Sequence, residues 1–387
     1  MTYPRLALDI GWGDLAAALA PPRPDAEDRI ALHVRRPAHA VTALSVRSAF
    51  DALLAELDLP DGCEIVMSAV NIDGMFEIAR AHGLTIRPVD VELSTLAPAA
   101  SAVKRAIGPK TRLVLVAHLF GARADLAGVA AVCRRAGVLL VEDCAQAFTG
   151  ALTLAGDVAL YSFGPIKSAT ALGGAVALVR DPKLVHRMRG RLDAYAPLPH
   201  GWFVRRLLKY AALKALNGPA PYGLLLKAIA ASGRDPEATV GALARGFSGA
   251  DLLEAIRRRP PAGLLSLLNR RLDRSEWPEA RHARAEAVLQ ALDVDVPGVA
   301  SADRSWWLAP VLSRDPERLV AGLRRAGFDA TRGSTSLRAL DMPNARRLID
   351  QVVYLPVTRY LSARAGRRLV QAIRRIEPAL APEALAA

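Results

Sequence analysis

The sequence predicts an α/β fold in which a parallel sheet is covered by helices on both faces. Along residues 64–141, short apolar runs alternate with stretches of helical spacing, which is the pattern of strand–helix–strand units. The last of these runs, at 138–141, ends abruptly in Glu142 and Asp143. Because ligands of such sheets bind at the carboxyl ends of the strands, we expect the functional site near Asp143.

The individual elements follow from local periodicity. The predicted strands are residues 64–68, 85–89, 113–118, 138–141, 157–163 and 174–179, and the helices between the first four are 73–82, 97–106 and 125–136. A helix precedes them at 45–57, with Phe50, Leu53 and Leu54 on its apolar face and Ser45 as its N-cap. Residues 1–43 show neither period clearly.

A smaller α+β domain is expected at the C-terminal end. Its strands are predicted at 306–312 and 352–357, and its helices at 316–326 and 361–376. A chain of 387 residues with 52% apolar content is long enough for two cores. We therefore divide it into a large domain, residues 1–273, and a small domain, residues 274–387.

The amino-acid composition argues against several kinds of site, location and ligand. The three cysteines have no metal-like spacing, so the sequence predicts neither a metal site nor a disulfide framework, and it favours a cytoplasmic location. The N-terminus does not resemble a secretory signal, and no apolar run is long enough to cross a bilayer. The net charge of +13 favours phosphate-bearing ligands. Nucleic acid is disfavoured, because the basic residues are scattered over helical segments without a recognised binding module.

Three residue types around the central strands indicate a specific cofactor chemistry. Lys167 lies in a loop between the last two strand-like runs, bounded by Pro165 and by Gly173–Gly174, and Ser162 precedes it. Pyridoxal 5′-phosphate (PLP) needs a lysine amine to hold its aldehyde, an acid against its ring nitrogen and small polar groups around its phosphate. Lys167, Asp143 and Ser162 supply one of each. The alternative is that Asp143 caps a turn and Lys167 is a solvated loop charge.

The motifs VEDCAQA (141–147) and YSFGPIKSATALGGAV (161–176) resemble those of the DegT/StrS family of PLP-dependent aminotransferases. This family has the fold-type I architecture of aspartate aminotransferase, a mixed, mostly parallel sheet between helices. The resemblance extends from about residue 44 over most of the chain and is weak near the N-terminus and between 195 and 258. It implies that Lys167 is the Schiff-base lysine, that Asp143 contacts the ring nitrogen and that Gln146 contacts the ring face or its hydroxyl.

The resemblance also implies a phosphate contact at the start of the helix at 45–57. There the family has Ser-Gly-Thr, whereas this chain has Ser45, Val46 and Arg47. Ser48 and the backbone amides are the expected contacts, with Arg47 as an additional clamp. Asn71 and Ile72 stand where the family has an aromatic that stacks on the ring, so Ile72 is the expected ring contact here.

Residues 195–258 form a basic insertion within the large domain. The segment 200–232 is amphipathic, with apolar residues such as Trp202 and Phe203 beside charged ones such as Arg205 and Lys209. It is expected to be either a helical lid or dimer arm, or a peripheral contact with the inner face of the membrane. The segment 246–261 occupies the place of a loop that in the family reaches the partner's phosphate, and one of Arg257, Arg258 and Arg259 is a candidate for that charge.

The function implied by the resemblance is transfer of an amino group from an amino acid, with glutamate as the expected donor, to a keto sugar, expected to be nucleotide-linked. The active sites of the family lie at a two-fold interface, which implies a homodimer. Two alternatives remain open. One is a PLP enzyme acting on a lipid-linked or other non-sugar ketone at a membrane, and the other is a catalytically silent relative that serves as a binding subunit.

Overall fold

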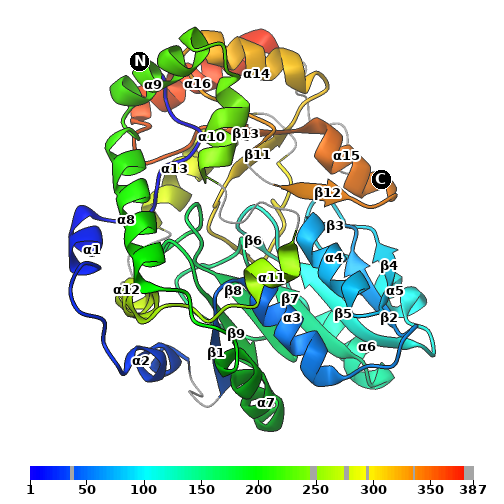
Figure 1. The fold of residues 1–387 in the computed structure, drawn as a ribbon. Helices are drawn as coiled ribbons and strands as arrows, with labels where there is room; N and C mark the ends of the chain where they lie inside the picture. The colour runs from blue at the N-terminus through cyan, green and yellow to red at the C-terminus, as the bar shows by residue number, and fades with distance from the viewer. Residues whose placement is uncertain (35–38, 245–250, 274–278, 293–295, 334–335, 379–387) are drawn as a thin grey trace.

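A computed structural model describes residues 1–34, 39–244, 251–273, 279–292, 296–333 and 336–378 of the chain (Figure 1). Its centre is a seven-stranded sheet with the order β1-β9-β8-β7-β5-β2-β4. The strands are β1 (Ala40–Ala43), β2 (Glu64–Ser68), β4 (Thr85–Val89), β5 (Thr111–Ala117), β7 (Leu139–Asp143), β8 (Val158–Ser162) and β9 (Ala175–Val179). All neighbouring pairs are parallel except β9, which is antiparallel to both β8 and β1.

Helices cover both faces of this sheet. On one face lie α3 (Val46–Leu57), α4 (Asp73–Ala81), α7 (Pro182–Asp193) and the short α11 (Leu252–Ile256). On the other lie α5 (Ala100–Ala106), α6 (Ala127–Ala136), α1 (Trp12–Ala17), α2 (Ala26–Leu32) and α12 (Ala262–Leu272). Alternate strand residues enter the two layers, Leu113 and Leu115 on the first side and Val114 and Val116 on the second. The mixed, mostly parallel α/β sheet predicted from the sequence is confirmed.

The C-terminal part of the chain packs separately around the antiparallel pair β11 (Ala309–Leu312) and β13 (Val352–Leu355). Three helices, α13 (Glu279–Gln290), α14 (Pro316–Arg325) and α16 (Ala363–Ile376), share its core, and α15 (Pro343–Gln351) packs on the side that faces the large sheet. The apolar stripe of α16, formed by Leu369, Val370 and Ile373, is buried there. This is the α+β unit expected from the sequence, with strands shorter than predicted.

Three small pairings connect the C-terminal part to the rest of the chain. Strand β12 (Leu337–Ala339) pairs with β3 (Val70–Ile72), and β10 (Asp303–Arg304) pairs with β6 (Ala122–Arg123). The first residues of the chain also cross over, since Tyr3 bridges to Phe328 and stacks on its ring at 5.3 Å. The N-terminal segment and β1 were not predicted as such, because their residues follow neither period.

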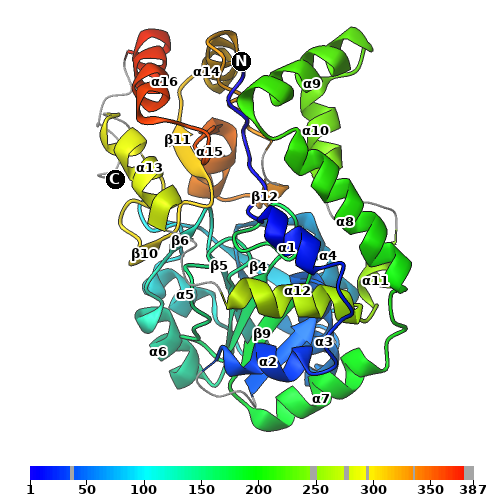
Figure 2. The same ribbon diagram turned by 90° about the vertical axis from the view of Figure 1, so that its left-hand side faces the viewer.

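The insertion is helical, with α8 (His200–Ala215), α9 (Pro219–Ala231) and α10 (Pro236–Ala244) running along the edge of both parts (Figure 2). Phe203, Leu207 and Tyr210 of α8 are fully buried against the large domain. The apolar side of α8 therefore packs inward against the large domain. In the part of the chain that the structure describes, no helix is both long enough and apolar enough to cross a bilayer.

Candidate active site

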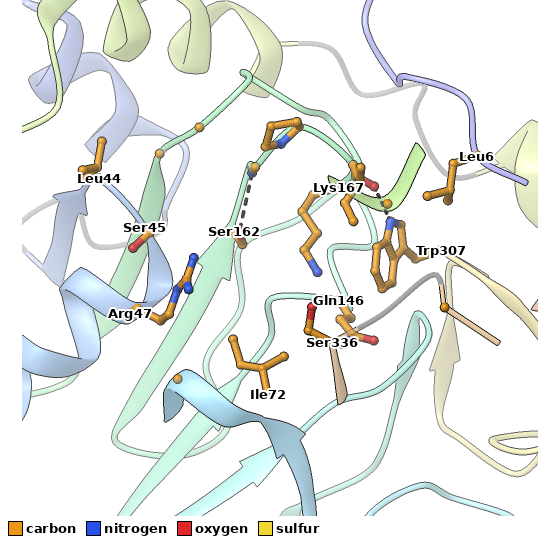
Figure 3. A pocket seen from close by; sticks show the side chains of 18 of the residues that line it. Leu6, Leu44, Ser45, Arg47, Ile72, Gln146, Ser162, Lys167, Trp307 and Ser336 are labelled. Carbon is orange, nitrogen blue, oxygen red and sulfur yellow. Dashed lines mark hydrogen bonds between the residues drawn. The ribbon is translucent and has the colours of Figure 1, made fainter. Parts of the chain in front are cut away.

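A cavity of about 340 Å³ lies where the carboxyl ends of the sheet strands meet the small domain and the insertion. Several elements contribute to it: the first turn of α3, the end of β3, the loop between β8 and β9, α8 and α10, and Trp307 from the small domain. Figure 3 shows the Lys167 amine and the Arg47 guanidinium directed into the same space. Five of the seven residues predicted for the site line this cavity, namely Arg47, Ile72, Gln146, Ser162 and Lys167.

Lys167 is enclosed by protein except where its side chain meets the cavity. Burial lowers the pKa of its amine to about 8, the Asp143 carboxylate opposes this shift, and Arg47 adds to it. The amine Nζ lies 3.9 Å from the ring centroid of Trp307, whose indole N–H donates to the backbone oxygen of Ile166 at 2.6 Å. A lysine in these surroundings has a large neutral fraction near pH 8 and can act as a nucleophile or a proton carrier.

Asp143 is the last residue of β7 and lies buried behind Lys167. Burial raises the pKa of its carboxyl group, while the N–H of Ala145, which donates to Oδ1 at 3.1 Å, and the charge of Lys167 act in the opposite direction. Each of Asp143 and Lys167 therefore influences the charge of the other. A buried carboxyl group of this kind is favoured as an anion when a cation binds beside it.

Asn71, at the centre of β3, has an unusual environment. Its Oδ1 accepts the N–H of Ile72 at 2.7 Å, but its buried Nδ2 makes no hydrogen bond. The amide lies near enough to Asp143 to lower the pKa of that carboxyl group, although no contact meets the geometry of a hydrogen bond. The Asn71 Nδ2 is therefore a buried donor that has no acceptor among the described residues. An unsatisfied buried donor destabilises the fold, which indicates a role for it in binding.

The start of α3 forms one end of the cavity. Ser45 caps the helix, its Oγ accepting the Ser48 N–H at 3.1 Å and lying 2.9 Å from the Ser48 Oγ. Ser45 lines the cavity, whereas Ser48 is fully buried and does not. Arg47 enters the cavity over Gly74, where a Cβ would lie 3.0 Å from the Arg47 Cδ. The helix start and this guanidinium together suit an anionic group.

The insertion contributes a second cation that sequence analysis did not predict. The Arg206 Nε donates to the backbone oxygen of Leu172, and its guanidinium packs over Trp202 and Tyr210. It lines the cavity beside Gly173 and Gly174, and burial lowers its pKa. It reaches the cavity because α8 packs against the loop between β8 and β9, a contact that local sequence patterns do not indicate. The basic face of the segment 200–232 thus supplies a side chain to the cavity.

The remaining predicted residues are held by backbone contacts. The Gln146 Oε1 accepts the Phe120 N–H at 2.9 Å, which fixes the orientation of the amide at the cavity wall. Ser162 ends β8, and Ile72 is anchored by the pairing of β3 with β12, opposite Leu337. Ser162 and Ile72 are therefore on strands, whereas Gln146 lies in the turn after β7 and is held there by its hydrogen bond to the backbone.

His118 does not face the cavity. Its Nε2 lies 3.3 Å from the Glu142 Oε2, and its Nδ1 accepts the Ala124 N–H. Glu142 is further bound by Arg123 and by the amides of Ala155 and Gly156. With Cys144, these side chains could in principle surround an ion. The full set of protein partners on Glu142 instead makes them a structural network, and the pKa of this carboxylate is lowered by its hydrogen bonds against the effect of burial.

Two of the three arginines proposed for a partner contact have side-chain partners within the chain. Arg257 binds the buried Asp51 carboxylate through Nε at 3.0 Å and Nη2 at 2.9 Å. Arg258 pairs with Glu254, and the backbone of Arg259 pairs with the segment at 196–198. Arg257 therefore ties the end of the insertion to α3, and its role at a partner site stays a prediction.

Comparison with known families finds a match in the N-terminal half of the chain. Residues 25–196 match the model of the DegT/DnrJ/EryC1/StrS aminotransferase family. The matched segment contains the start of α3, Asp143 and Lys167, which are the sequence features on which the DegT/StrS resemblance was based.

Curated relatives match over part of their length. A UDP-N-acetyl-3-dehydro-α-D-glucosamine 3-aminotransferase of Acidithiobacillus ferrooxidans is 30% identical over 159 residues, which cover 40% of this chain and 43% of that protein. A dTDP-4-dehydro-2,3,6-trideoxy-D-glucose 4-aminotransferase of Saccharopolyspora spinosa is 34% identical over 140 residues, which cover 34% of this chain and 36% of the relative. The sequence match thus spans less than half of each relative.

Solved structures extend the likeness in fold over nearly the whole chain. The aminotransferase TlmJ from Streptoalloteichus hindustanus superposes with a TM-score of 0.70 at 21% identity, over 97% of this chain and 98% of TlmJ. The putative sugar aminotransferase Spr1654 from Streptococcus pneumoniae, in its PMP form, gives 0.72 at 15% identity, over 98% of both chains. The small domain and the insertion therefore belong to the same fold as the family segment.

Proposed function

We propose that this chain is a PLP-dependent aminotransferase that moves an amino group from an amino acid, with glutamate as the expected donor, to a nucleotide-linked keto sugar. The observation that carries the proposal is the presence of a desolvated lysine, a buried aspartate and an anion-binding helix start around one cavity inside the family segment. Bound PLP supplies an aldehyde that bonds to amines and a ring that accepts the electrons of a broken bond.

The residues of the cavity fit this cofactor. Lys167 Nζ would hold the aldehyde carbon and, once released, move a proton at Nζ, for which the lowered pKa of about 8 provides a neutral amine. Asp143 would face the ring nitrogen, where a cation beside it favours the ionised carboxylate. The unsatisfied Asn71 Nδ2 supplies a spare donor beside that carboxylate. Gln146 and Ile72 would contact the ring, and their backbone ties limit their motion.

The phosphate end is proposed at the start of α3. The Ser45 hydroxyl, the positive end of α3 and the Arg47 guanidinium line the cavity there, with Arg206 and Ser162 nearby. Ser48 would act indirectly, since its hydroxyl supports Ser45. A buried anion site of this kind needs cations to offset desolvation, and Arg47 and Arg206 provide two.

The substrate class is supported by the relatives. Both curated proteins are named for nucleotide-linked keto sugars, one UDP-linked and one dTDP-linked. The net charge of +13 supports the same class, since a positive field raises the local concentration of phosphorylated ligands. Neither the names of the relatives nor the net charge identifies the carbon that is aminated.

The cofactor is tested by absorbance. The purified chain mixed with PLP is expected to give a band near the visible edge that is lost in Lys167→Ala and kept in Lys110→Ala, whose exposed lysine lies outside the cavity. A band of equal intensity in Lys167→Ala would contradict the assignment of this lysine. Screening the pyridoxamine form against a panel of nucleotide-linked and free ketones then identifies the acceptor.

A homodimer in the cytoplasm is part of the proposal, following the two-fold arrangement expected from the resemblance. Light scattering of the purified chain is expected to give twice the chain mass of 41.3 kDa. Peripheral membrane contact through 200–232 is the less favoured alternative, because Phe203, Leu207 and Tyr210 pack inside the protein. Binding to anionic vesicles that is abolished when this segment is deleted would restore that alternative.

A further inference from the structure

The ring face of Trp307 lies directly against the amine of Lys167. The Lys167 Nζ is 3.9 Å from the centroid of the indole ring, and both side chains line the candidate cavity (Figure 3). Trp307 is buried, so the contact is shielded from water. Indole attracts a cation more strongly than the other aromatic side chains do, and the attraction grows when water is excluded. The ring therefore favours the charged form of the amine, against the effect of burial.

The indole N–H of Trp307 fixes the backbone next to the lysine. It donates to the carbonyl oxygen of Ile166 at 2.6 Å, and Ile166 directly precedes Lys167 in the chain. On the other side of the lysine, the Ser168 Oγ accepts a hydrogen bond from the Arg281 Nη2 at 2.7 Å. Trp307 and Arg281 both come from the C-terminal part of the chain, so that part holds the residues on either side of Lys167. Trp307 alone contacts both the amine and its backbone.

The backbone that leads into Trp307 has an unfavourable conformation. Trp306 has a φ of 44°, in a region that bulky side chains rarely adopt. Such a conformation persists only where surrounding contacts fix it, and it is concentrated at functional sites. Here the Trp306 indole N–H donates to the Glu286 carboxylate at 2.6 Å, and the Ser305 N–H donates to the backbone oxygen of Gly121 at 2.8 Å. The fixed turn at Trp306 sets the direction in which the next side chain, Trp307, leaves the backbone.

Gly121 leaves the space in which this backbone lies. Its φ of 94° suits glycine, and a Cβ at this position would clash with the backbone nitrogen of Trp307. The neighbouring Phe120 N–H donates to the Gln146 Oε1 at 2.9 Å, and the Phe120 carbonyl oxygen accepts the Leu308 N–H at 3.1 Å. Trp307 is therefore held against the same loop that orients Gln146 at the cavity wall.

We propose that Trp307 is a positioning residue for Lys167: its ring face holds the amine whenever the amine is not bonded to the cofactor, and its N–H fixes the loop that carries the lysine. This inference rests on the proposed function and deepens it. An amine held in one place stays close to the reacting atoms, which favours its reaction. The Asp143 carboxylate and the Arg47 guanidinium also act on this amine, and Arg206 of α8 lines the same cavity. The ring differs from these groups because it attracts the amine without a net charge of its own.

The ring contact is tested by placing one, two or three fluorine atoms on the Trp307 ring of the full chain, through site-specific incorporation of fluorinated tryptophans. Fluorine withdraws electron density from the ring face and leaves the shape of the side chain nearly unchanged, so it weakens the attraction for a cation without altering burial. The pKa of Lys167 is measured without PLP, from competitive labelling with acetic anhydride over a pH series and mass spectrometry of the Lys167 peptide. We expect this pKa to fall from about 8 with each added fluorine, by about half a pH unit or more for three. The same tryptophans at the exposed Trp12, outside the cavity, are the control and should not change it.

Trp307→Phe tests the hydrogen bond to the loop. This substitution keeps an aromatic ring and removes the N–H that binds the Ile166 oxygen. The rate of PLP incorporation well above pH 8, where the amine is neutral, should therefore fall by about tenfold, the effect of one hydrogen bond. Trp12→Phe should leave this rate unchanged. Melting curves show whether Trp307→Phe folds, and the fluorinated chains keep the ring contact testable if it does not.

The possible results distinguish this proposal from a purely structural role of Trp307 and from failure of the proposed function. A Lys167 pKa that stays constant on fluorination of Trp307, or that falls equally on fluorination of Trp12, overturns the proposal, even if Trp307→Phe lowers the melting temperature. An unchanged incorporation rate in a folded Trp307→Phe chain overturns the role of the N–H. If the pKa falls with fluorination but PLP gives no absorbance band, the contact between ring and amine is supported and the proposed function is wrong.

Discussion

At the scale of single residues, Lys167 is expected to make the reactivity of the chain dependent on pH. Only the neutral amine attacks an aldehyde, and burial, together with Arg47, places the pKa of this amine at about 8. The rate of PLP incorporation into the cofactor-free chain should therefore rise about tenfold per pH unit below 8 and level off above it. Stopped-flow absorbance measures this rate.

Asp143→Asn provides the check on this interpretation. Asp143 raises the pKa of Lys167, so removing its charge should move the midpoint of the incorporation profile below 8. A midpoint near 10.5, the ordinary lysine value, in the wild-type chain would show that the amine is solvated. A midpoint shifted upward in Asp143→Asn would contradict the coupling between the two residues.

Asn71→Leu is expected to separate stability from binding. The substitution keeps the side-chain volume similar and removes a buried donor that has no acceptor, so the cofactor-free chain should gain about 1 kcal/mol in free energy of unfolding. If the donor serves the bound cofactor, affinity for PLP should fall by about tenfold. Denaturant unfolding and fluorescence titration measure the two effects. A less stable cofactor-free variant would show that Nδ2 already has a partner in the empty site.

At the scale of elements, the ion pair between Asp51 of α3 and Arg257, which follows α11, is expected to make the stability of the fold depend on pH in the acid range. Burial alone would raise the pKa of Asp51, but hydrogen bonds from His82 and Arg257 lower it to about 2. Because the folded pKa lies below the unfolded value of 3.8, this contribution is fully present above about pH 4 and is lost as the pH falls toward 2. It amounts to about 2 kcal/mol.

Unfolding by denaturant at a series of pH values tests this contribution. Asp51→Asn should remove most of the difference in stability between pH 5 and pH 3 that this site causes. An unchanged pH dependence in the variant would show that other carboxylates are responsible. His82 and Arg257 come from α4 and from the end of α11, so the same pair also fixes how these helices pack on α3.

At the scale of the whole molecule, the first residues hold the two parts of the chain together. Arg5 and Asp329 are both buried and form a bidentate pair, to which Tyr222 also donates. Arg5→Ala should lower the free energy of unfolding by about 3 kcal/mol, because it leaves the buried Asp329 with only the longer contact to Arg324, at 3.6 Å. Arg346→Ala breaks an exposed pair with Asp341 of similar length, 2.8 Å, and should cost about 1 kcal/mol or less. Equal losses in a thermal melt would show that burial does not distinguish the pairs.

Much of the fold and part of the site were predictable from the chain alone. Strand and helix positions in the large domain follow from hydrophobic periodicity, and Ser45 was predictable as an N-cap because capping is a local hydrogen bond. The location of Asp143 at a strand end, and of Lys167 in the loop after β8, followed from the same patterns.

Other features depend on contacts between residues distant in sequence. The sequence by itself determined the α/β alternation, the resemblance to one family and the residue types that a cofactor site requires, because all three are local properties of the chain. Only the tertiary structure decided that Ser48 is buried behind Ser45, that α8 brings Arg206 to the cavity and that His118 turns to Glu142. These placements depend on how helices and loops separated by up to hundreds of residues pack together, and hydrophobic periodicity contains no information on such packing.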